Sequence, residues 1–368
     1  MIRRTRQTQP PGLGLRWAAH LFRILGWAED PGISRGARAL SVAVLQSCRD
    51  ADLSVWRGGA SMANEIKFGA ALNSRGDDVE FAKKLEALGF DSAWVGDHPQ
   101  NTEGYTYLAA MAGATSRITI GSRVIVLPLR EPLMNAKMAT QIDRISGGRF
   151  IFGVGIGGEG NDDEFPNLGV PMRERGRRAN ENLEVMTRLF NEENVTFEGR
   201  YYNVRNLTLS PKPIQQPHPP IWMGGRAPEA VARAAKYADG WFPNLNTVDG
   251  LRDRVKEIKR QANELKRDMS NFTIGIVART FVGPNHDVAH AEAAARGVPP
   301  GTRASTDWDA MVDRYAAHGT GKDIIEYCER YIAEGASHFV FNMYAPPERM
   351  DQDLEVIRTD VLPYFRDR

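Results

Sequence analysis

The sequence has little of the residues that mark several specialised protein classes. Among 368 residues there are two cysteines, Cys48 and Cys328, which lie far apart in the chain. This excludes a disulfide framework and a thiolate metal site, and it fits a reducing compartment. The formal net charge is +1, so the chain lacks the excess of basic residues that is typical of nucleic-acid-binding proteins. No apolar run approaches the roughly 20 residues that a membrane helix needs. We therefore expect a cytoplasmic protein that binds neither nucleic acid nor a membrane.

The signatures of several catalytic mechanisms are also missing. The sequence has no HExxH, no GxSxG and no GxxxxGK[ST]. Its histidines show no metal-ligand spacing, and they are His20, His98, His218, His286, His290, His318 and His338. His286 and His290 are four residues apart, but they fall in a Pro/Gly-rich segment with no carboxylate placed to orient them. We therefore expect no metal site.

Residues 1–61 differ in composition from the rest of the chain. Their basic residues are all arginine, and few acidic residues oppose them. Trp17, Leu21 and Leu25 could form one face of a short basic amphipathic helix, as in a transit peptide or a membrane-surface segment. Met62, directly before the first regular element, instead favours a start codon assigned too far upstream and a disordered leader that is not native. We favour the second interpretation, with the folded domain over residues 62–368.

From Ile66 onward, short apolar runs alternate with amphipathic helical patterns at the spacing of βα units. The runs predict strands at 66–72, 92–96, 118–127, 150–154, 221–223, 240–242, 272–282 and 339–343. The clearest amphipathic stripe between them is Leu251, Val255, Ile258, Ala262 and Leu265. Such a series in about 300 residues predicts an α/β fold, a TIM (β/α)8 barrel with insertions after strands 4, 5 and 7. The insertions cover residues 155–170, 195–220 and 284–306, and the last of these looks mobile. A doubly wound sheet is the competing architecture.

The stretch Phe90–Pro99, FDSAWVGDHP, ends an apolar strand in two ionisable residues, Asp97 and His98. In an α/β barrel the chemistry lies at the carboxyl ends of the strands, so this pair is a candidate site. An imidazole, with an unperturbed pKa of about 6.5, suits proton transfer near neutral pH. The alternative is that Asp97 caps the following loop and that His98 bonds to backbone.

Residues 153–158, GVGIGG, match the dinucleotide fingerprint GxGxxG. The residues that follow, EGNDDEFPN, do not open an amphipathic helix, and Arg178 rather than an acid stands about 20 residues on. A Rossmann domain is therefore not expected here. The glycines instead let a planar ring approach the backbone at the barrel mouth, or they form a plain turn.

A second glycine pair follows a predicted strand in Trp222–Arg226, WMGGR. Pro228 marks the first turn of the helix that comes next. Backbone N–H groups at such a helix start, the close approach allowed by Gly224 and Gly225, and the charge of Arg226 favour a phosphate site. A helix cap without a ligand is the alternative.

Taken together, these stretches resemble the luciferase-like flavin- or deazaflavin-dependent oxidoreductases, a family of TIM barrels, and most closely its coenzyme F420-dependent branch. The resemblance covers residues 66–343. It rests on the order and spacing of FDSAWVGDH, ITIGSRVIVLPLREPLMNAKMATQIDRISGGRFIFGVGIGG, GVPMRERGRR, FEGRYYNV, PKPIQQPHPPIWMGG and AAKYADGWFP.

The resemblance implies roles for individual residues. His98 matches the catalytic histidine of the branch, and Asp97 matches its cofactor-contacting acid at the end of strand 2. Further matches to cofactor-binding positions are Ile156, Gly157, Asn161, Gly224 and Gly225. A non-proline cis peptide is expected between Arg123 and Val126, and Val126 is expected to contact the cofactor.

One position departs from the family. The second catalytic acid of the branch, a glutamate, aligns with Gly158, and Glu159 is one residue later. Either a one-residue shift lets Glu159 serve as this acid, or the reaction of this protein differs.

The matches imply hydride transfer between coenzyme F420 and a small organic substrate, with His98 moving a proton on a substrate oxygen. An FMN-dependent monooxygenase, supplied with reduced flavin by a partner flavin reductase, is the alternative. A third possibility is a barrel that binds the cofactor without catalysis. Family members are often homodimers, and we expect one here.

Overall fold

The computed structural model describes residues 65–72, 77–98, 102–158, 164–297 and 306–367 of the chain. All of them belong to one unit, Asn64–Arg368. The leader expected over residues 1–61 lies outside the described residues. Within the described ranges, no helix is long and apolar enough to cross a membrane.

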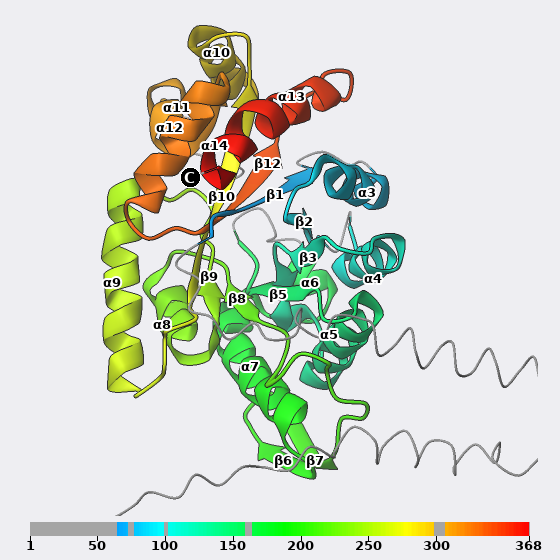
Figure 1. Cartoon of the computed structure of the whole chain (residues 1–368). Coiled ribbons are helices and arrows are strands. Elements are labelled where there is room, and N and C mark those ends of the chain that lie inside the picture. The colour runs from blue at the N-terminus through cyan, green and yellow to red at the C-terminus, as the bar shows by residue number, and fades with distance from the viewer. Residues whose placement is uncertain (1–64, 73–76, 99–101, 159–163, 298–305, 368) are drawn as a thin grey trace, which may run out of the picture. The chain divides into compact units, whose positions relative to one another are not determined.

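Eight parallel strands close into a barrel, as the alternating pattern predicts (Figure 1). They follow one another in sequence order, and the last strand returns to pair with the first in the register Lys67 to His338. The barrel strands are β1 (Lys67–Leu72), β2 (Ser92–Val95), β3 (Thr119–Ser122), β5 (Phe150–Gly155), β8 (Ile221–Met223), β9 (Gly240–Trp241), β10 (Thr273–Val282) and β12 (His338–Met343). The TIM-barrel prediction is therefore confirmed.

The remaining strands extend this framework. β4 (Ile125–Val126) pairs with β5, and β6 (Val195–Glu198) forms an antiparallel hairpin with β7 (Asn203–Leu207). β11 (Ala316–Gly319) pairs in parallel with the end of β10. Because β12 occupies one edge of β10, β11 lies on the same edge as β9.

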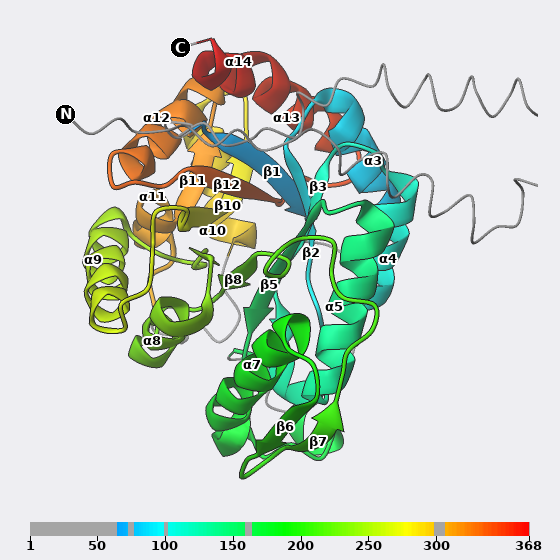
Figure 2. The same cartoon turned by 60° about the horizontal axis from the view of Figure 1, so that its bottom comes forward.

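Helices surround the strands on the outside of the barrel (Figure 2). The longer ones are α3 (Asp78–Leu88), α4 (Gly104–Ala114), α5 (Pro132–Ser146), α7 (Arg175–Asn191), α8 (Pro228–Tyr237), α9 (Val248–Glu264), α10 (His286–Arg296) and α12 (Gly321–Ile332). The shorter ones are α6 (Glu164–Asn167), α11 (Val312–Tyr315), α13 (Met350–Val356) and α14 (Leu362–Arg366), with 3-10 turns at Leu127–Leu129, Met172–Glu174 and Asp309–Met311 and a π-helical turn at Ile357–Val361.

Local sequence signals explain several helix ends. The side chain of Asp77 accepts hydrogen bonds from the backbone of Val79 and Glu80, which caps the start of α3. Gly89 ends that helix with a φ of 81°, a conformation that glycine adopts without steric cost. These caps fix where α3 begins and ends between β1 and β2, and therefore help to set the position of the β2 end.

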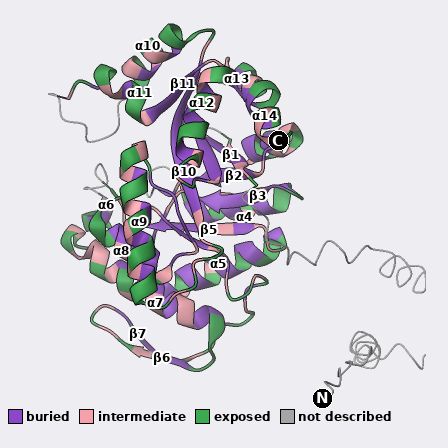
Figure 3. Cartoon of the chain, turned by 60° about the vertical axis from the view of Figure 1, so that its left-hand side comes forward, coloured by how far each residue is buried: buried purple, intermediate pink, exposed green. Residues whose placement is uncertain are grey.

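The core has two layers, one inside the barrel and one between strands and helices. Inside the barrel the rings of Trp94, Trp222 and Phe242 contact one another, with centroids 5.4 to 5.6 Å apart. The barrel strands are mostly buried on both faces, whereas the outer helices are buried on the side that faces the barrel (Figure 3). This burial explains why the strands appear in the sequence as short continuous apolar runs.

The expected insertions differ in detail from the structure. Residues 195–220 contain the β6–β7 hairpin and precede β8, the fifth barrel strand, while the connection after β8 contains α8. The expectation that 284–306 is a mobile insertion is wrong for His286–Arg296, which forms α10. The Asn285 side chain caps α10, and its alanine-rich sequence has high helix propensity. Residues 298–305 lie outside the described residues.

Two further expectations need correction. Leu265 was assigned to the buried stripe of α9, but it follows the last helical residue and is half exposed. His286 and His290 were expected to have no carboxylate nearby, but Oδ1 of Asp313 lies 3.2 Å from Nδ1 of His290. Neither Asp313 nor its helix α11 is signalled by the local pattern around the two histidines.

Candidate active site

A cavity of about 760 Å³ opens at the carboxyl ends of the barrel strands. This is the end at which TIM-barrel enzymes carry their active sites. The cavity is lined by the described residues that the sequence singled out, namely Asp97, His98, Val126, Ile156, Gly157, Gly224, Gly225 and Arg226. Glu159 and Asn161 lie outside the described residues. The structure therefore brings the two glycine-rich turns and the histidine to one cavity wall.

His98 follows β2, and its backbone is held by two hydrogen bonds with Thr102, of 2.8 and 2.9 Å. The residue is exposed, and its imidazole makes no hydrogen bond or ion pair with another described residue. His98 thus has a fixed backbone and an exposed imidazole that lines the cavity.

Asp97 is buried, and both oxygens of its carboxylate are bonded to other groups of the protein. It accepts hydrogen bonds from the backbone of Gly104 and Val126, both 3.1 Å, and forms a bidentate ion pair with Arg130. The side chain has no exposed surface. A contact between Asp97 and a bound cofactor would therefore involve its backbone, and the carboxylate acts by tying the loop after β2 to the segment after β3.

A cis peptide bond joins Arg123 to Val124, within the range where the sequence predicts one. The Val124 side chain occupies the space next to two glycines. A Cβ atom would lie 2.5 Å from it on Gly155 and 2.9 Å from it on Gly224. These glycines are therefore needed for packing around Val124, which is a different reason from the close approach of a ring. Gly158, in contrast, has no atom of the described residues within 4 Å of the place where a Cβ would be.

The second glycine turn leads into the first turn of α8. Gly225 has a φ of 91°, and the start of α8 has no side-chain cap. Uncapped N–H groups at a helix start attract anions. The Arg226 guanidinium donates to the Leu245 carbonyl, which holds its charge near this turn.

A cavity of about 790 Å³ lies at the opposite, amino end of the strands, lined by residues such as Lys67, His218 and Asn271. His338 closes its inner side, where it contacts Ser92 at 2.7 Å. Residues at this end of a TIM barrel serve stability rather than chemistry. We therefore place the candidate active site at the carboxyl end.

Comparison with known proteins gives the family of this chain. The model of a family described as luciferase-like monooxygenase matches residues 58–338. The chain belongs to the luciferase-like monooxygenase family. Members of this family and the named relatives are oxidoreductases or monooxygenases, so the protein is a luciferase-like oxidoreductase.

Relatives in the luciferase-like family use two kinds of cofactor. An FMNH2-dependent dimethylsulfone monooxygenase from Pseudomonas putida is 29% identical over 54% of this chain and 54% of its own length. An F420-dependent glucose-6-phosphate dehydrogenase from Kineococcus radiotolerans is 26% identical over 78% of this chain and 92% of its own length. The structure of the F420-dependent tetrahydromethanopterin reductase from Methanopyrus kandleri has a TM-score of 0.68 at 21% identity, over 82% of this chain and 100% of its own, which shows the shared fold.

The sequence analysis did not identify two arginines, Arg175 and Arg233, that line the cavity at the carboxyl ends of the barrel strands next to α8. Nε of Arg175 is buried and has no hydrogen-bond partner in the described part of the chain. Arg233 donates to Asn180 and Gly176, and burial lowers its pKa. The arginine-rich stretch at the start of α7 was a usable signal for Arg175, but nothing in the sequence shows that α8 brings Arg233 to it.

Two charged residues at the barrel mouth were also missed. Arg123 donates to the Leu72 carbonyl and the Asn342 side chain, and burial lowers its pKa. Burial raises the pKa of Asp78 to about 6, although nearby Arg123 acts in the opposite direction. Nothing in the sequence distinguishes Asp78 from the neighbouring Asp77. Asp78 is therefore a carboxyl group at this end of the barrel that titrates close to neutral pH.

Proposed function

We propose that the protein is a coenzyme F420-dependent oxidoreductase that transfers a hydride between the deazaflavin and a small organic substrate. The observation that carries this proposal is that the accessible imidazole of His98 and the basic turn at the start of α8 line the same cavity. A proton-transfer group and an anion site in one cavity suit a redox cofactor with a charged tail.

The hydrogen-bond donors that line the cavity suit the phosphate-containing tail of this cofactor. Gly224, Gly225 and Arg226 would bind phosphate at the start of α8, and the unpartnered Nε of Arg175 supplies a further donor. Val126, Ile156 and Gly157 would lie against the ring system. When bound, the deazaflavin supplies a ring carbon that accepts or gives a hydride.

His98 would take or give the proton on the substrate oxygen through an imidazole nitrogen. Histidine is the side chain most often used for proton transfer in enzymes, and it suits this role. Asp97 positions the loop that carries His98 through its bonds to Val126 and Arg130. Glu159, next to the open position at Gly158, is proposed as a second acid.

Two observations favour F420 over FMN. The F420-dependent dehydrogenase from Kineococcus radiotolerans matches over more of both chains than the FMNH2-dependent monooxygenase does. The cavity is also rich in arginine, with Arg173, Arg175, Arg226 and Arg233 on its wall. An acidic cofactor tail would be attracted by this charge.

An FMN-dependent monooxygenase is the second candidate, because the FMNH2-dependent relative has the higher identity. In that case a partner flavin reductase would supply reduced FMN, and O2 would be the second substrate. With either cofactor we propose a homodimer, because members of the family are often dimers. Measuring the molecular mass of the protein in solution tests this.

The test compares two assays on the same preparation. In the first, oxidised F420 is mixed without oxygen with a panel of alcohols, and reduced F420 with aldehydes and imines, and the visible absorbance of the deazaflavin is followed. In the second, oxygenated product is measured with NADH, FMN, O2, an added flavin reductase and a panel of sulfones and sulfonates, because free reduced FMN consumes O2 by itself. Turnover in the first assay supports the proposal. Turnover in the second assay alone would replace it with the monooxygenase.

A further inference from the structure

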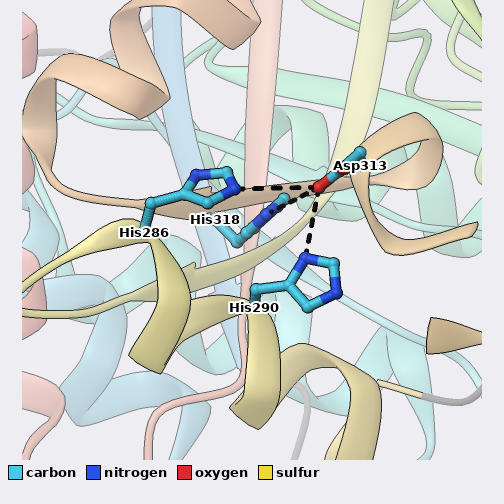
Figure 4. Close-up of side chains that lie close together, drawn as sticks. All are labelled: His286, His290, Asp313 and His318. Atoms are coloured by element: carbon cyan, nitrogen blue, oxygen red, sulfur yellow. Dashed lines mark hydrogen bonds and ion pairs between the residues drawn. The ribbon is translucent and has the colours of Figure 1, made fainter. Parts of the chain in front are cut away.

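Three histidines and one aspartate converge outside the active-site cavity. His286 and His290 come from α10, Asp313 from α11 and His318 from β11, and their side chains point toward one another (Figure 4). One ligand atom from each lies within 4.8 Å of the others. None of these residues lines the cavity at the barrel mouth, and a separate cavity of about 660 Å³ opens beside them.

The nitrogens surround one carboxylate oxygen. Oδ1 of Asp313 lies 3.1 Å from Nε2 of His318, 3.2 Å from Nδ1 of His290 and 3.9 Å from Nε2 of His286. Ligand atoms around a tetrahedral Zn²⁺, each about 2.0–2.1 Å from the ion, are about 3.3 Å apart. The observed spacing is therefore close to that of an occupied site, and small side-chain shifts would complete it.

The outer nitrogen of each imidazole faces an oxygen atom. Nδ1 of His286 lies 3.7 Å from Asp323, Nε2 of His290 lies 3.3 Å from Asp309, and Nδ1 of His318 lies 3.2 Å from the carbonyl of Ala316. Metal-binding histidines commonly donate their second N–H to such an oxygen, which fixes the ring and leaves a lone pair on the inner nitrogen. His318 and His290 have such an oxygen within 3.3 Å of the outer nitrogen, whereas the oxygen that faces His286 is farther away.

When the outer nitrogens carry the protons, the inner atoms form a set of acceptors without a donor. Nε2 of His318 is buried and makes no hydrogen bond with the part of the chain that the structure describes. A proton on one imidazole would satisfy one nitrogen–oxygen contact, whereas a cation at the centre satisfies all four atoms.

We propose that His286, His290, Asp313 and His318 bind one divalent transition-metal cation. Imidazole and carboxylate ligands in a four-coordinate arrangement suit Zn²⁺. Because the four residues come from α10, α11 and β11, the ion would join the two helices to the strand that extends β10. This site is independent of the cofactor and of the reaction at the barrel mouth.

The sequence explains part of this site. Residues four apart on a helix lie on the same face, so α10 presents His286 and His290 together. The fold supplies the rest, because β11 pairs with β10 and brings His318 next to α10. The spacing of residues 286, 290, 313 and 318 does not match a short metal motif, which is why the sequence alone predicts no metal here.

The test uses the full-length protein without a histidine tag, treated with a chelator and then titrated with Zn²⁺ in a calorimeter. We expect one Zn²⁺ per chain. His286 is half exposed, so His286→Gln leaves the core intact, and it should weaken Zn²⁺ binding at least tenfold. The double variant His286→Gln/His290→Gln should lose the site, whereas His218→Gln, far from the cluster in sequence, should bind like the parent protein.

Two further readouts make the result decisive. Co²⁺ should give the visible absorption of a tetrahedral ion in the parent protein and in His218→Gln only. Zn²⁺ should raise the unfolding temperature of the parent protein and leave that of the double variant unchanged. The proposal is overturned if the parent binds Zn²⁺ no more tightly than the double variant, or if stoichiometric binding is the same in all variants. Circular dichroism of the metal-free variants checks that each is folded.

Discussion

The carboxylate of Asp97 and the guanidinium of Arg130 form a bidentate ion pair with distances of 2.7 and 2.8 Å. The pair sits directly next to His98, and the Asp97 side chain has no exposed surface. Removing one partner of a buried pair costs about 3–5 kcal/mol, and without Asp97 the guanidinium of Arg130 would keep only the exposed Glu103 as a charged partner. The pair therefore links the stability of the barrel to the position of the proposed catalytic histidine.

Replacing Asp97 by alanine should lower the free energy of unfolding by about 3–5 kcal/mol, because Arg130 would lose its buried partner. Urea unfolding measures this change. Glu103→Gln is the matched control, since Glu103 pairs with the same arginine from an exposed position. Its cost should be about 1 kcal/mol or less. Equal losses in the two variants would contradict the role given to Asp97.

Gly155→Ala should be destabilising by about 1–3 kcal/mol, because the new Cβ would lie 2.5 Å from the Val124 side chain. Adding Val124→Ala should recover part of this loss, and a double-mutant cycle measures the coupling. Gly158→Ala is the control, since its new Cβ meets no atom of the described residues, and it should change stability by less than about 0.5 kcal/mol. Additive effects of the changes at 155 and 124 would show that the two sites are not in contact.

Burial lowers the pKa of His338 to about 3, well below the ordinary value of 6.5. The unfolded chain therefore binds one more proton than the folded chain between these pH values, and stability is lost as pH falls from 6.5 toward 3. The slope from this residue reaches about 1.4 kcal/mol per pH unit.

His338→Gln removes this titrating group and keeps a polar side chain near Ser92. Urea unfolding of both proteins at about pH 5 and about pH 7.5 measures the effect. The parent should lose more stability at the lower pH than the variant does. An identical pH dependence in the two proteins would mean that His338 is not held neutral in the barrel.

His98→Ala should reduce turnover by about 10²–10⁴-fold, the usual contribution of a general acid or base. Cofactor affinity should change little, since the basic turn at the start of α8 remains. Steady-state kinetics and a cofactor titration on the same variant separate the two effects. His218→Ala, at the amino end of the barrel, is the control for loss of a histidine. Unchanged turnover in His98→Ala would remove His98 from the mechanism.

Much of the barrel could be predicted because its strands are short apolar runs between clear helix signals. Gly89 ends α3 as expected, and the run at residues 92–96 matches β2 closely. β11 escaped prediction because AAHG is too short and too mixed to stand out, and it becomes a strand only by pairing with β10.

The candidate site was predictable to the extent that its residues sit next to one another in sequence. His98 and the pair Gly224–Gly225 each follow a strand, so their place at the barrel mouth comes from the fold class. Arg233 could not be placed in the same way, because its position on the cavity depends on how α8 packs against α7. The same is true of His318, whose neighbours come from separate elements.

Fluorescence titration with F420 and with FMN tests most directly whether the cavity at the barrel mouth binds a deazaflavin through the basic turn at the start of α8. We expect F420 to bind more tightly than FMN, with an affinity that falls steeply as salt rises from about 50 mM to about 500 mM. Arg175→Met and Arg226→Met should weaken F420 binding about tenfold or more, whereas Arg177→Met, off the cavity wall, should not. Tighter binding of FMN, or F420 binding that is the same in all three variants, would contradict the claim.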